Sequence, residues 1–281
     1  METLYIKLNK LQTSLKEIGS VAVAFSGGVD STFLLKVAHQ TLGDQTIAIT
    51  AVSELYPARE TEEARKFAAD NNIRHIEYEV NELAVPGFSS NPENRCYLCK
   101  KNLFSNFKKL IDVQKFTLIE GSNVDDDSDY RPGMQATKEL GVISPLREAG
   151  LTKAEIRRLS REMGLATHNK QSFACLASRF PYGETITAEK LKAIETAEQF
   201  LLNMGFRQVR VRNHGNLARI EVNPDEMEKL MNPETRETIY NGLIKAGFTY
   251  VTSDLKGYRT GSMNETLNQK NFKKSLFCQK T

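Results

Sequence analysis

Residues 21–31, VAVAFSGGVDS, constrain the fold of this chain more than any other segment. Val21 to Phe25 is a run of small and β-branched apolar residues, which is typical of a buried parallel strand. Ser26-Gly27-Gly28 follows it, and residues 31–42 then have the apolar spacing of a helix. A glycine turn between a strand and a helix directs backbone N–H groups outward at the positive end of the helix dipole. The segment therefore predicts an anion site, to which Ser26 and Ser31 add hydroxyl donors.

The same segment also indicates which anion is bound. It lacks the lysine of GxxxxGK[ST] loops, and Asp30 suits an anion site only if a metal ion lets it face phosphates. SGGVDS resembles the PP-loop of ATP pyrophosphatases, which hold the pyrophosphate end of ATP and transfer AMP. The resemblance implies ATP and Mg²⁺ as ligands, with Asp30 at the metal. An ordinary glycine turn is the alternative, and the match of six positions in a strand–turn–helix setting favours the nucleotide.

Strands and helices alternate through the first half of the chain. Further apolar strands are predicted at residues 46–53, 73–80 and 116–123, with helical segments between them. This alternation predicts an α/β fold, a doubly wound parallel sheet with helices on both faces. Ligands of such sheets bind beyond the carboxyl ends of the strands. We therefore expect residues 26–31, 52–54 and 121–127 to converge, with adenine and ribose against Val52, Ser53 and Gly121.

The second half has a different organisation. Thr152 and Glu155 form a predicted capping box at the start of a helix over residues 152–165. A linker, HNKQSFACLASRFPYG, follows, and beyond it a helix, a hairpin around His214-Gly215-Asn216, two helices and a strand predict a compact α+β unit. We therefore predict a PP-loop domain over residues 1–170 and a smaller substrate-binding or oligomerisation domain over residues 171–281.

Composition excludes several classes of protein. The 281 residues are 40% hydrophobic and 26% charged, as in a soluble protein that buries a core. A net charge of +3 is too small to indicate a nucleic acid or membrane partner. No stretch approaches the ~18 apolar residues of a membrane span, and the amphipathic N-terminus does not resemble a signal peptide. We expect a cytoplasmic protein, in which the four cysteines indicate metal binding or catalysis rather than disulfides.

Three of these cysteines suit a shared role. Cys96 and Cys99 form a CxxC motif at the start of a predicted helix, and Cys175 lies in the linker. Structural zinc normally takes a fourth ligand, whereas three thiolates suit a [4Fe–4S] cluster with one open iron. A redox disulfide between Cys96 and Cys99, with Cys175 as nucleophile, is the other option. Cys278 lies in a terminal segment that we expect to fray, and it is interpreted as a bystander.

Six motifs, in order along nearly the whole chain, match one family. They are SGGVDS, SELYP, EGSNVDDDSDYRPGMQA, SPLREAGLTKAEIR, CLASRFPYGETIT and VRVRNHGNLARIEV. Together they resemble the LarE family of ATP-dependent sulfur transferases. The resemblance implies adenylation of the carboxylates of pyridinium-3,5-biscarboxylic acid mononucleotide and their conversion to thiocarboxylates, in the synthesis of the nickel-pincer nucleotide cofactor of lactate racemase. It also implies a homo-oligomer.

The family has two forms. One sacrifices the sulfur of a single cysteine, which becomes dehydroalanine. In the other, three cysteines bind a [4Fe–4S] cluster that carries an extra sulfide. The CxxC of this chain resembles the second form, which implies that Cys96, Cys99 and Cys175 are both metal ligands and catalytic residues.

Polar residues in the motifs are candidates for binding. The acidic loop Asp125, Asp126, Asp127 and Asp129 is a candidate for Mg²⁺, with Asp126 chosen for the cofactor, although an Asx-rich turn explains any one of these residues equally well. Arg131 and Arg147 are weaker candidates for anion contacts. The substrate-binding set consists of Ser178, Arg179, Glu198, Arg210 and Arg212. We expect Arg179 to bind a substrate anion in a bidentate manner. Arg210 and Arg212 share one strand face, so they bind the phosphate of the substrate, pair across the strands with Glu221, or contact another copy of the chain in an oligomer.

Three other functions use parts of the same pattern. A PP-loop tRNA thiolase shares the adenylation and the cysteines, but it needs an electropositive RNA surface. An ammonia-using synthetase shares the ATP site and leaves the three cysteines unused. A nucleotide-binding zinc module is the alternative that is not an enzyme, and it predicts zinc without acid-labile sulfide.

Overall fold

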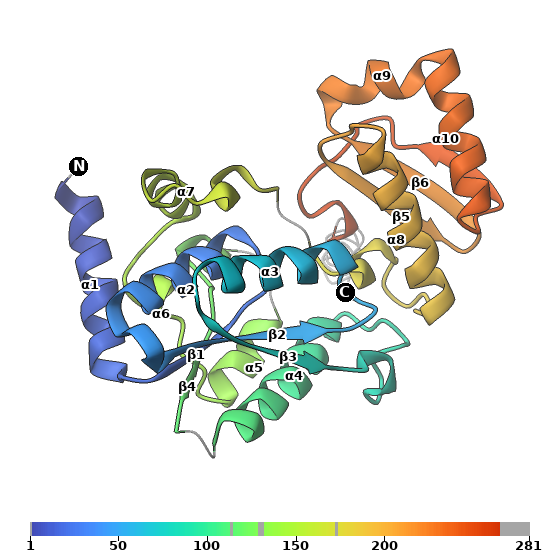
Figure 1. The fold of residues 1–281 in the computed structure, drawn as a ribbon. Coiled ribbons are helices and arrows are strands. Elements are labelled where there is room, and N and C mark those ends of the chain that lie inside the picture. Colours follow the sequence, from blue (N-terminus) through green and yellow to red (C-terminus); the bar gives the residue numbers. More distant parts are fainter. Residues whose placement is uncertain (1, 113–114, 129–131, 172–173, 265–281) are drawn as a thin grey trace, which may run out of the picture. The chain divides into compact units, whose positions relative to one another are not determined.

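The computed structural model describes residues 2–112, 115–128, 132–171 and 174–264 (Figure 1). It divides into two compact units, one formed by Met1–Phe88 and Pro92–Ala174 and the other by Ser89–Asn91 and Cys175–Thr281. The sequence placed the boundary near residue 170, whereas the second unit starts at Cys175. Ser89–Asn91 belongs to the second unit because the Asn91 side chain donates to Pro181 O at 2.6 Å and its carbonyl accepts from Gly183 N at 2.9 Å.

The first unit contains the parallel sheet that the sequence predicts. Its strands are β1 (Val21–Ala24), β2 (Thr46–Val52), β3 (Arg74–Glu79) and β4 (Thr117–Ile119). They pair in the order β3-β2-β1-β4, and every pairing is parallel. Val21, Ala22 and Val23 are fully buried at the centre of the sheet, as their apolar run predicts. The predicted α/β fold is therefore confirmed.

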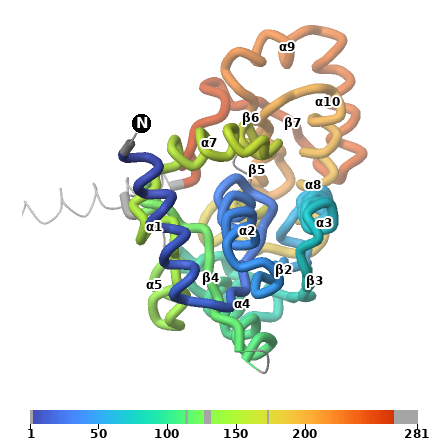
Figure 2. The backbone as a smooth tube through the Cα atoms, turned by 60° about the vertical axis from the view of Figure 1, so that its left-hand side comes forward, coloured from blue at the N-terminus to red at the C-terminus, as the bar shows by residue number. Residues whose placement is uncertain are grey.

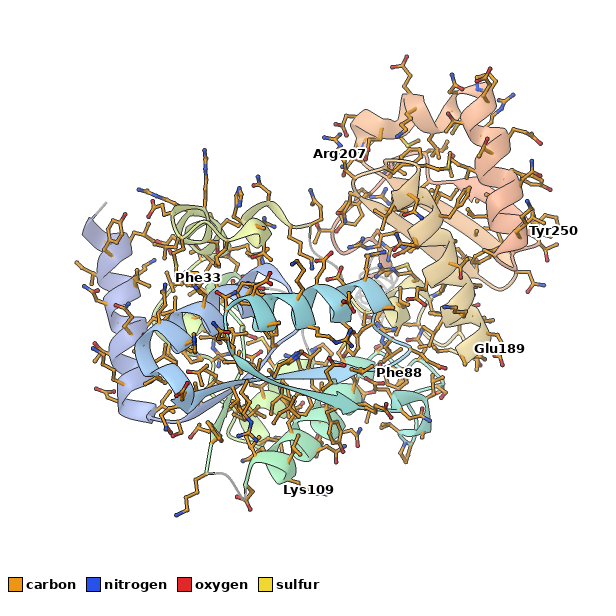
Figure 3. All side chains as sticks on the ribbon, in the orientation of Figure 1. Phe33, Phe88, Lys109, Glu189, Arg207 and Tyr250 are labelled. Carbon is orange, nitrogen blue, oxygen red and sulfur yellow. The ribbon has the colours of Figure 1, made fainter. Side chains whose placement is uncertain are left out.

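Helices cover both faces of this sheet. They are α1 (Glu2–Ile18), α2 (Val29–Leu42), α3 (Ala58–Asp70), α4 (Arg95–Asp112), α5 (Gly133–Glu139), α6 (Pro145–Glu148) and α7 (Lys153–Glu162). Val21 and Val23 point to the core shared with α1, α2, α3, α6 and α7, whereas Ala22 points to a second core shared with α4. Figure 1 shows α2 and α3 on one face and α4 and α5 on the other, and in Figure 2 α2 again lies between α1 and α3. Phe33, labelled in Figure 3, is the largest apolar side chain that α2 buries completely.

Two element boundaries differ from the prediction. Helix α4 begins at Arg95, so both cysteines of the CxxC motif lie in its first two turns, whereas the sequence predicts helix only from residue 99 onward in the segment CKKNLFSNFKKLI. Strand β4 ends at Ile119, four residues before the predicted end. It ends early because the Glu120 carboxylate accepts from the backbone N–H and hydroxyl of Ser122, at 3.2 and 2.8 Å, which turns the chain out of the extended path. The predicted capping box of Thr152 and Glu155 is present at α7.

The second unit is a three-stranded sheet with helices. Its strands are β5 (Val209–His214), β6 (Leu217–Val222) and β7 (Tyr250–Ser253), and its helices are α8 (Ala188–Asn203), α9 (Met227–Met231) and α10 (Pro233–Lys245). Strands β5 and β6 form the predicted hairpin, in which Gly215 has a φ of +63°, and β7 pairs parallel to β6. Tyr250 on β7 is 65% exposed and points outward in Figure 3. No helix in the described ranges of either unit is long and apolar enough to cross a membrane.

Candidate active site

The turn between β1 and α2, residues 26–31, forms the phosphate loop. Gly27 has a φ of +68°, a left-handed conformation that favours glycine, and Gly28 is the N-cap of α2. The Ser26 and Ser31 hydroxyls lie 3.1 Å apart at the start of the helix. The N–H groups in the first turn of a helix have no acceptor within the helix. The predicted loop residues are thus together at a helix N-terminus that presents donors to an anion.

The turn after β4 contacts the phosphate loop. A Cβ atom on Gly121 would lie 3.1 Å from Ser31 N and 3.3 Å from the Asp30 carbonyl carbon, so only glycine fits there without a shift. Val52 ends β2, which is paired with β1. The Ser53 hydroxyl accepts from Leu55 N at 3.2 Å. The contact of Val52, Ser53 and Gly121 with adenine and ribose stays a prediction.

Asp30 has one carboxylate oxygen that is not satisfied by the described residues. Its Oδ2 accepts from the Lys153 ammonium, whereas Oδ1 is buried and has no hydrogen-bond partner among the described residues. A buried carboxylate oxygen without a partner is costly unless a cation or donor completes it, and carboxylate oxygen is a ligand that Mg²⁺ takes. The residues at this loop therefore fit Mg²⁺.

Asp125 and Asp126 of the acidic loop both accept from backbone N–H groups. Asp126 Oδ2 accepts from Asn123 N at 3.1 Å, and Asp125 Oδ2 accepts from Lys153 N at 2.8 Å. Asn123 Oδ1 accepts from Asp125 N at 2.9 Å, which is the contact of an Asx turn. The binding of Mg²⁺ by Asp126 stays a prediction. Asp129, Arg131 and the side chain of Asp127 lie outside the described residues. Arg147 lies on α6, away in sequence from the phosphate loop.

Two buried charges near these loops were not foreseen. Lys170 Nζ donates to Gly27 O at 3.0 Å and pairs with Glu60. Glu120 is 6% exposed, and although burial opposes its ionisation, Lys100 and the Ser144 and Ser122 donors hold its pKa below the usual value. Glu120 opens the motif EGSNVDDDSDYRPGMQA, in which no role was assigned to it, and a single lysine in a linker is an ordinary surface residue in most sequences.

The three predicted metal-ligating cysteines are thiols that are not joined in disulfides. Cys96 is exposed, and Cys99 and Cys175 are partly buried. Cys96 and Cys99 belong to the first unit and Cys175 to the second. Within the described part of the chain, no three His, Cys, Asp or Glu side chains gather as metal ligands. Cys278 lies outside the described residues.

In the second unit, Arg179 and Glu198 form a buried ion pair. Arg179 Nε and Nη2 each donate to a carboxylate oxygen of Glu198 at 2.8 Å, and neither side chain is more than 1% exposed. The bidentate contact predicted between Arg179 and a substrate anion is instead made with Glu198. Nη1 of Arg179 donates to the Ser178 hydroxyl at 2.8 Å and to Cys175 O at 3.2 Å. Arg179 thus holds the turn that carries Cys175 and Ser178.

Arg212 lies beside this turn and is only partly satisfied. It donates to Ser178 O at 3.0 Å and to Glu221 at 2.7 Å, as the alternative prediction of cross-strand pairing has it. It also donates to the Ser262 hydroxyl at 3.0 Å, a contact that sequence patterns gave no reason to expect. The Nε of Arg212 is nevertheless buried with no hydrogen-bond partner in the described part of the chain.

One network of charges in the second unit contains more arginines than carboxylates. Its described members, which we call the arginine cluster, are Arg179, Arg210, Arg212, Arg219 and Arg259 with the carboxylates of Glu198, Glu221 and Asp254. Arg210 is 3% exposed and lies over the Tyr258 ring, 5.1 Å from its centroid. Burial, and then repulsion by Arg179, lower the pKa of Arg210 to about 10. Such an excess of cations is stabilised by an anion, so the cluster suits a phosphate or a carboxylate.

Comparisons with known proteins cover both units of the chain. The family described as asparagine synthase matches residues 11–87, which hold the phosphate loop and strands β1 to β3. Pyridinium-3,5-bisthiocarboxylic acid mononucleotide synthase of Lactiplantibacillus plantarum is 36% identical over 96% of this chain and 98% of its own length. The chain belongs to the LarE family, within the PP-loop superfamily of ATP-utilising enzymes. The recognition made from its motifs is confirmed.

Other relatives mark the extent of the family. A Synechocystis protein of uncharacterised function, slr1717, is 42% identical over 94% of this chain and 98% of its own length. A glutamine-hydrolysing GMP synthase polypeptide of Thermoplasma acidophilum is 29% identical over 90% of this chain and 79% of its own length. The match to the Lactiplantibacillus plantarum synthase, which covers 96% of this chain, spans both units.

Proposed function

We propose that this chain is an ATP-dependent sulfurtransferase that converts the carboxylates of pyridinium-3,5-biscarboxylic acid mononucleotide into thiocarboxylates, for the nickel-pincer nucleotide cofactor. The observation that carries the proposal is the 36% identity, over nearly both full lengths, to the synthase named for the bisthiocarboxylate product. The phosphate loop and the arginine cluster support it, because the proposed reaction needs one site for ATP and another for an anionic substrate.

The first step is adenylation. A substrate carboxylate oxygen attacks the α-phosphorus of ATP, the bond between this phosphorus and the α,β-bridging oxygen breaks, and pyrophosphate leaves with the electron pair. Backbone N–H groups of Gly27 and Gly28 and the hydroxyls of Ser26 and Ser31 bind the pyrophosphate, whose negative charge grows during this step. Mg²⁺, held by Asp30, supplies charge neutralisation at the phosphates when bound.

The second step forms the carbon–sulfur bond. A sulfur nucleophile attacks the acyl carbon of the acyl adenylate, the carbon–oxygen bond to the phosphate breaks, and AMP leaves. Burial opposes the charge of Arg179, and the Glu198 carboxylate outweighs this effect, so the pKa of Arg179 is raised. Arg179 therefore stays a cation, and its donation to Cys175 O at 3.2 Å holds the backbone that carries the Cys175 thiol.

The donor set also fits a cluster. Cys96, Cys99 and Cys175 are not joined in disulfides and supply three thiolates, the ligands that iron–sulfur clusters take. These residues would hold a [4Fe–4S] cluster, which supplies a bound sulfide that can be replenished. We propose this form over the sacrificial one because the CxxC motif gives the chain two thiols beyond Cys175.

The arginine cluster is proposed to bind the substrate phosphate. Arg212 has a buried Nε without a partner among the described residues, and Arg210 lies in the same excess of positive charge. Arg179 and Glu198 are proposed to support this site and not to contact the substrate, since they satisfy each other. Ser178 joins the two arginines Arg179 and Arg212 through its hydroxyl and carbonyl.

The test begins with anaerobic purification and measurement of iron and acid-labile sulfide. The protein is then given the dicarboxylate mononucleotide, ATP and Mg²⁺, and nucleotides, product and polypeptide mass are measured. We expect AMP, pyrophosphate, thiocarboxylate and an unchanged polypeptide mass. Loss of one sulfur atom from Cys175 would show that this cysteine, and not a cluster, is the source of the sulfur. Formation of ADP would contradict the proposal. Full turnover by Cys175→Ala would favour an ammonia-using synthetase, and thiolation of added tRNA would favour a tRNA thiolase.

A further inference from the structure

Lys170 makes a contact with the phosphate loop that the proposed chemistry does not use. It follows the 3₁₀ turn Ala166–Asn169, far in sequence from the loop. Its ammonium donates to Gly27 O at 3.0 Å and pairs with Glu60 at 2.7 Å and Glu63 at 2.6 Å. The Lys170 side chain is 12% exposed, so little of it faces water, and its ammonium contacts these three oxygens. All four residues belong to the first unit.

The backbone of Lys170 is fixed as well. Arg157 on α7 donates to His168 O at 2.6 Å and to Lys170 O at 2.9 Å. Lys170 is thus held both at its backbone and at its ammonium group. Its side chain has little rotamer freedom left, so the contact with Gly27 O costs little further conformational entropy. The direction of the Lys170 ammonium is therefore set by α7 and α3 together.

Its target is the residue of the loop with the most unusual backbone. Gly27 has a φ of +68°, and a Cβ atom there would lie 3.3 Å from Glu60 O and 3.5 Å from the Ala64 Cβ. An anion cradle works only when peptide N–H groups face the anion and the carbonyl groups face away. A donor on the Gly27 carbonyl fixes the direction of the peptide that joins Gly27 to Gly28, and hence the direction of the Gly28 N–H.

We propose that Lys170 is a positioning residue for ATP, which holds the Gly27–Gly28 peptide in the orientation that binds pyrophosphate. This inference rests on the proposed binding of ATP at the phosphate loop. Glu60 and Glu63 balance the charge of Lys170, so its effect is exerted on the carbonyl and not as a free cation on the phosphates. The role is distinct from that of a salt bridge that only stabilises the fold.

The test measures the dissociation constant of Mg²⁺–ATP by calorimetry, together with thermal unfolding, at low and at high salt. Lys170→Met is expected to raise the dissociation constant roughly tenfold, the equivalent of one charge-assisted hydrogen bond. The loss is expected to persist in large part at high salt, because salt screens a partly buried contact less than an exposed one. Lys66→Met is the matched control, since Lys66 lies on α3, pairs with Asp70 on the same helix, and is 74% exposed.

Two more variants separate positioning from charge and from folding. Glu63→Gln removes a balancing carboxylate and leaves the Gly27 contact, so we expect an unchanged dissociation constant. Tighter ATP binding by Glu63→Gln, or a Lys170→Met defect abolished by salt, would show that charge alone acts and would overturn the proposal. Lys170→Arg keeps the charge with a different reach and is expected to lose severalfold in affinity. If Lys170→Met does not fold, the affinity of Lys170→Arg for ATP is the measurement that tests the proposal.

The outcomes distinguish this inference from the proposed function. If the wild-type protein binds ATP and both Lys170 variants bind it equally well, only the role of Lys170 is overturned. If the wild-type protein binds no ATP, the proposed function falls and the role of Lys170 falls with it.

Discussion

Arg179 and Glu198 satisfy each other through two parallel hydrogen bonds of 2.8 Å in the interior of the second unit. Glu198 also accepts from Val211 N at 2.9 Å, which ties helix α8 to strand β5. The pair thus joins the turn after Cys175 to the sheet that carries Arg210 and Arg212. The pair therefore anchors the short irregular segment that follows Cys175.

Replacing Glu198 with glutamine is expected to destabilise the second unit by about 3–5 kcal/mol, because it leaves the Arg179 cation buried without its counter-charge. Urea unfolding of the variant and the wild type, followed by far-UV circular dichroism, measures the difference. Lys192→Met is the control on the same helix, since Lys192 is 75% exposed. A loss within about 0.5 kcal/mol of the control would mean that the pair contributes little.

Arg212→Lys is expected to raise the KM for the pyridinium mononucleotide at least tenfold and to leave the dissociation constant of ATP unchanged. Lysine keeps the charge but loses the planar fork, and a charge-assisted hydrogen bond contributes roughly 1.5–3 kcal/mol. Steady-state kinetics with each substrate varied in turn measures the effect. Arg236→Lys on the exposed face of α10 is the control. Equal changes for both substrates would argue against a phosphate site at Arg212.

Gly121→Ala is expected to weaken ATP binding roughly tenfold while the protein stays folded. The added Cβ atom would press on Ser31 N and the Asp30 carbonyl carbon, and a small misplacement of binding groups is costly. Gly19→Ala is the control for a glycine replacement outside the phosphate loop. Gly19 has a φ of +85° and open space at its Cβ position, so alanine there strains the backbone without pressing on other atoms. Calorimetric titration with Mg²⁺–ATP measures both variants. Unchanged affinity in Gly121→Ala would show that the loop tolerates the shift.

Much of the first unit was predictable because each of its signals is local. The apolar run at β1, the glycine turn and the helical spacing that follows are set by residues close in sequence, and they specify the phosphate loop without knowledge of the rest. The Thr152–Glu155 capping box is equally local, and it is present as predicted. The hairpin around Gly215 was found in the same way.

The remaining contacts depend on pairs distant in sequence. Lys170 meets Gly27 across 143 positions, and Ser262 meets Arg212 across 50. Arg179 was expected to bind substrate because its neighbours lie in a family motif, yet its fork is filled by Glu198 from another helix. The sequence shows which residues are charged. The partner of each charge depends on tertiary packing, which local sequence patterns do not specify.

Glu82 provides a prediction about pH. It is 2% exposed, and burial raises its pKa, although a hydrogen bond with Ser53 opposes the rise. A carboxyl group whose pKa is raised on folding binds its proton more tightly in the folded state, so stability falls as pH rises from the unfolded pKa through the folded one. Glu82→Gln removes this dependence. The stability of the variant relative to wild type is therefore expected to increase as pH rises above the usual pKa of a glutamate, measured by urea unfolding across a series of pH values. Glu228→Gln, a change on helix α9 in the other unit, is the control for general loss of charge. If the difference between Glu82→Gln and wild type stayed constant with pH, the carboxyl group would have to be equally ionised in both states, and burial would not govern it.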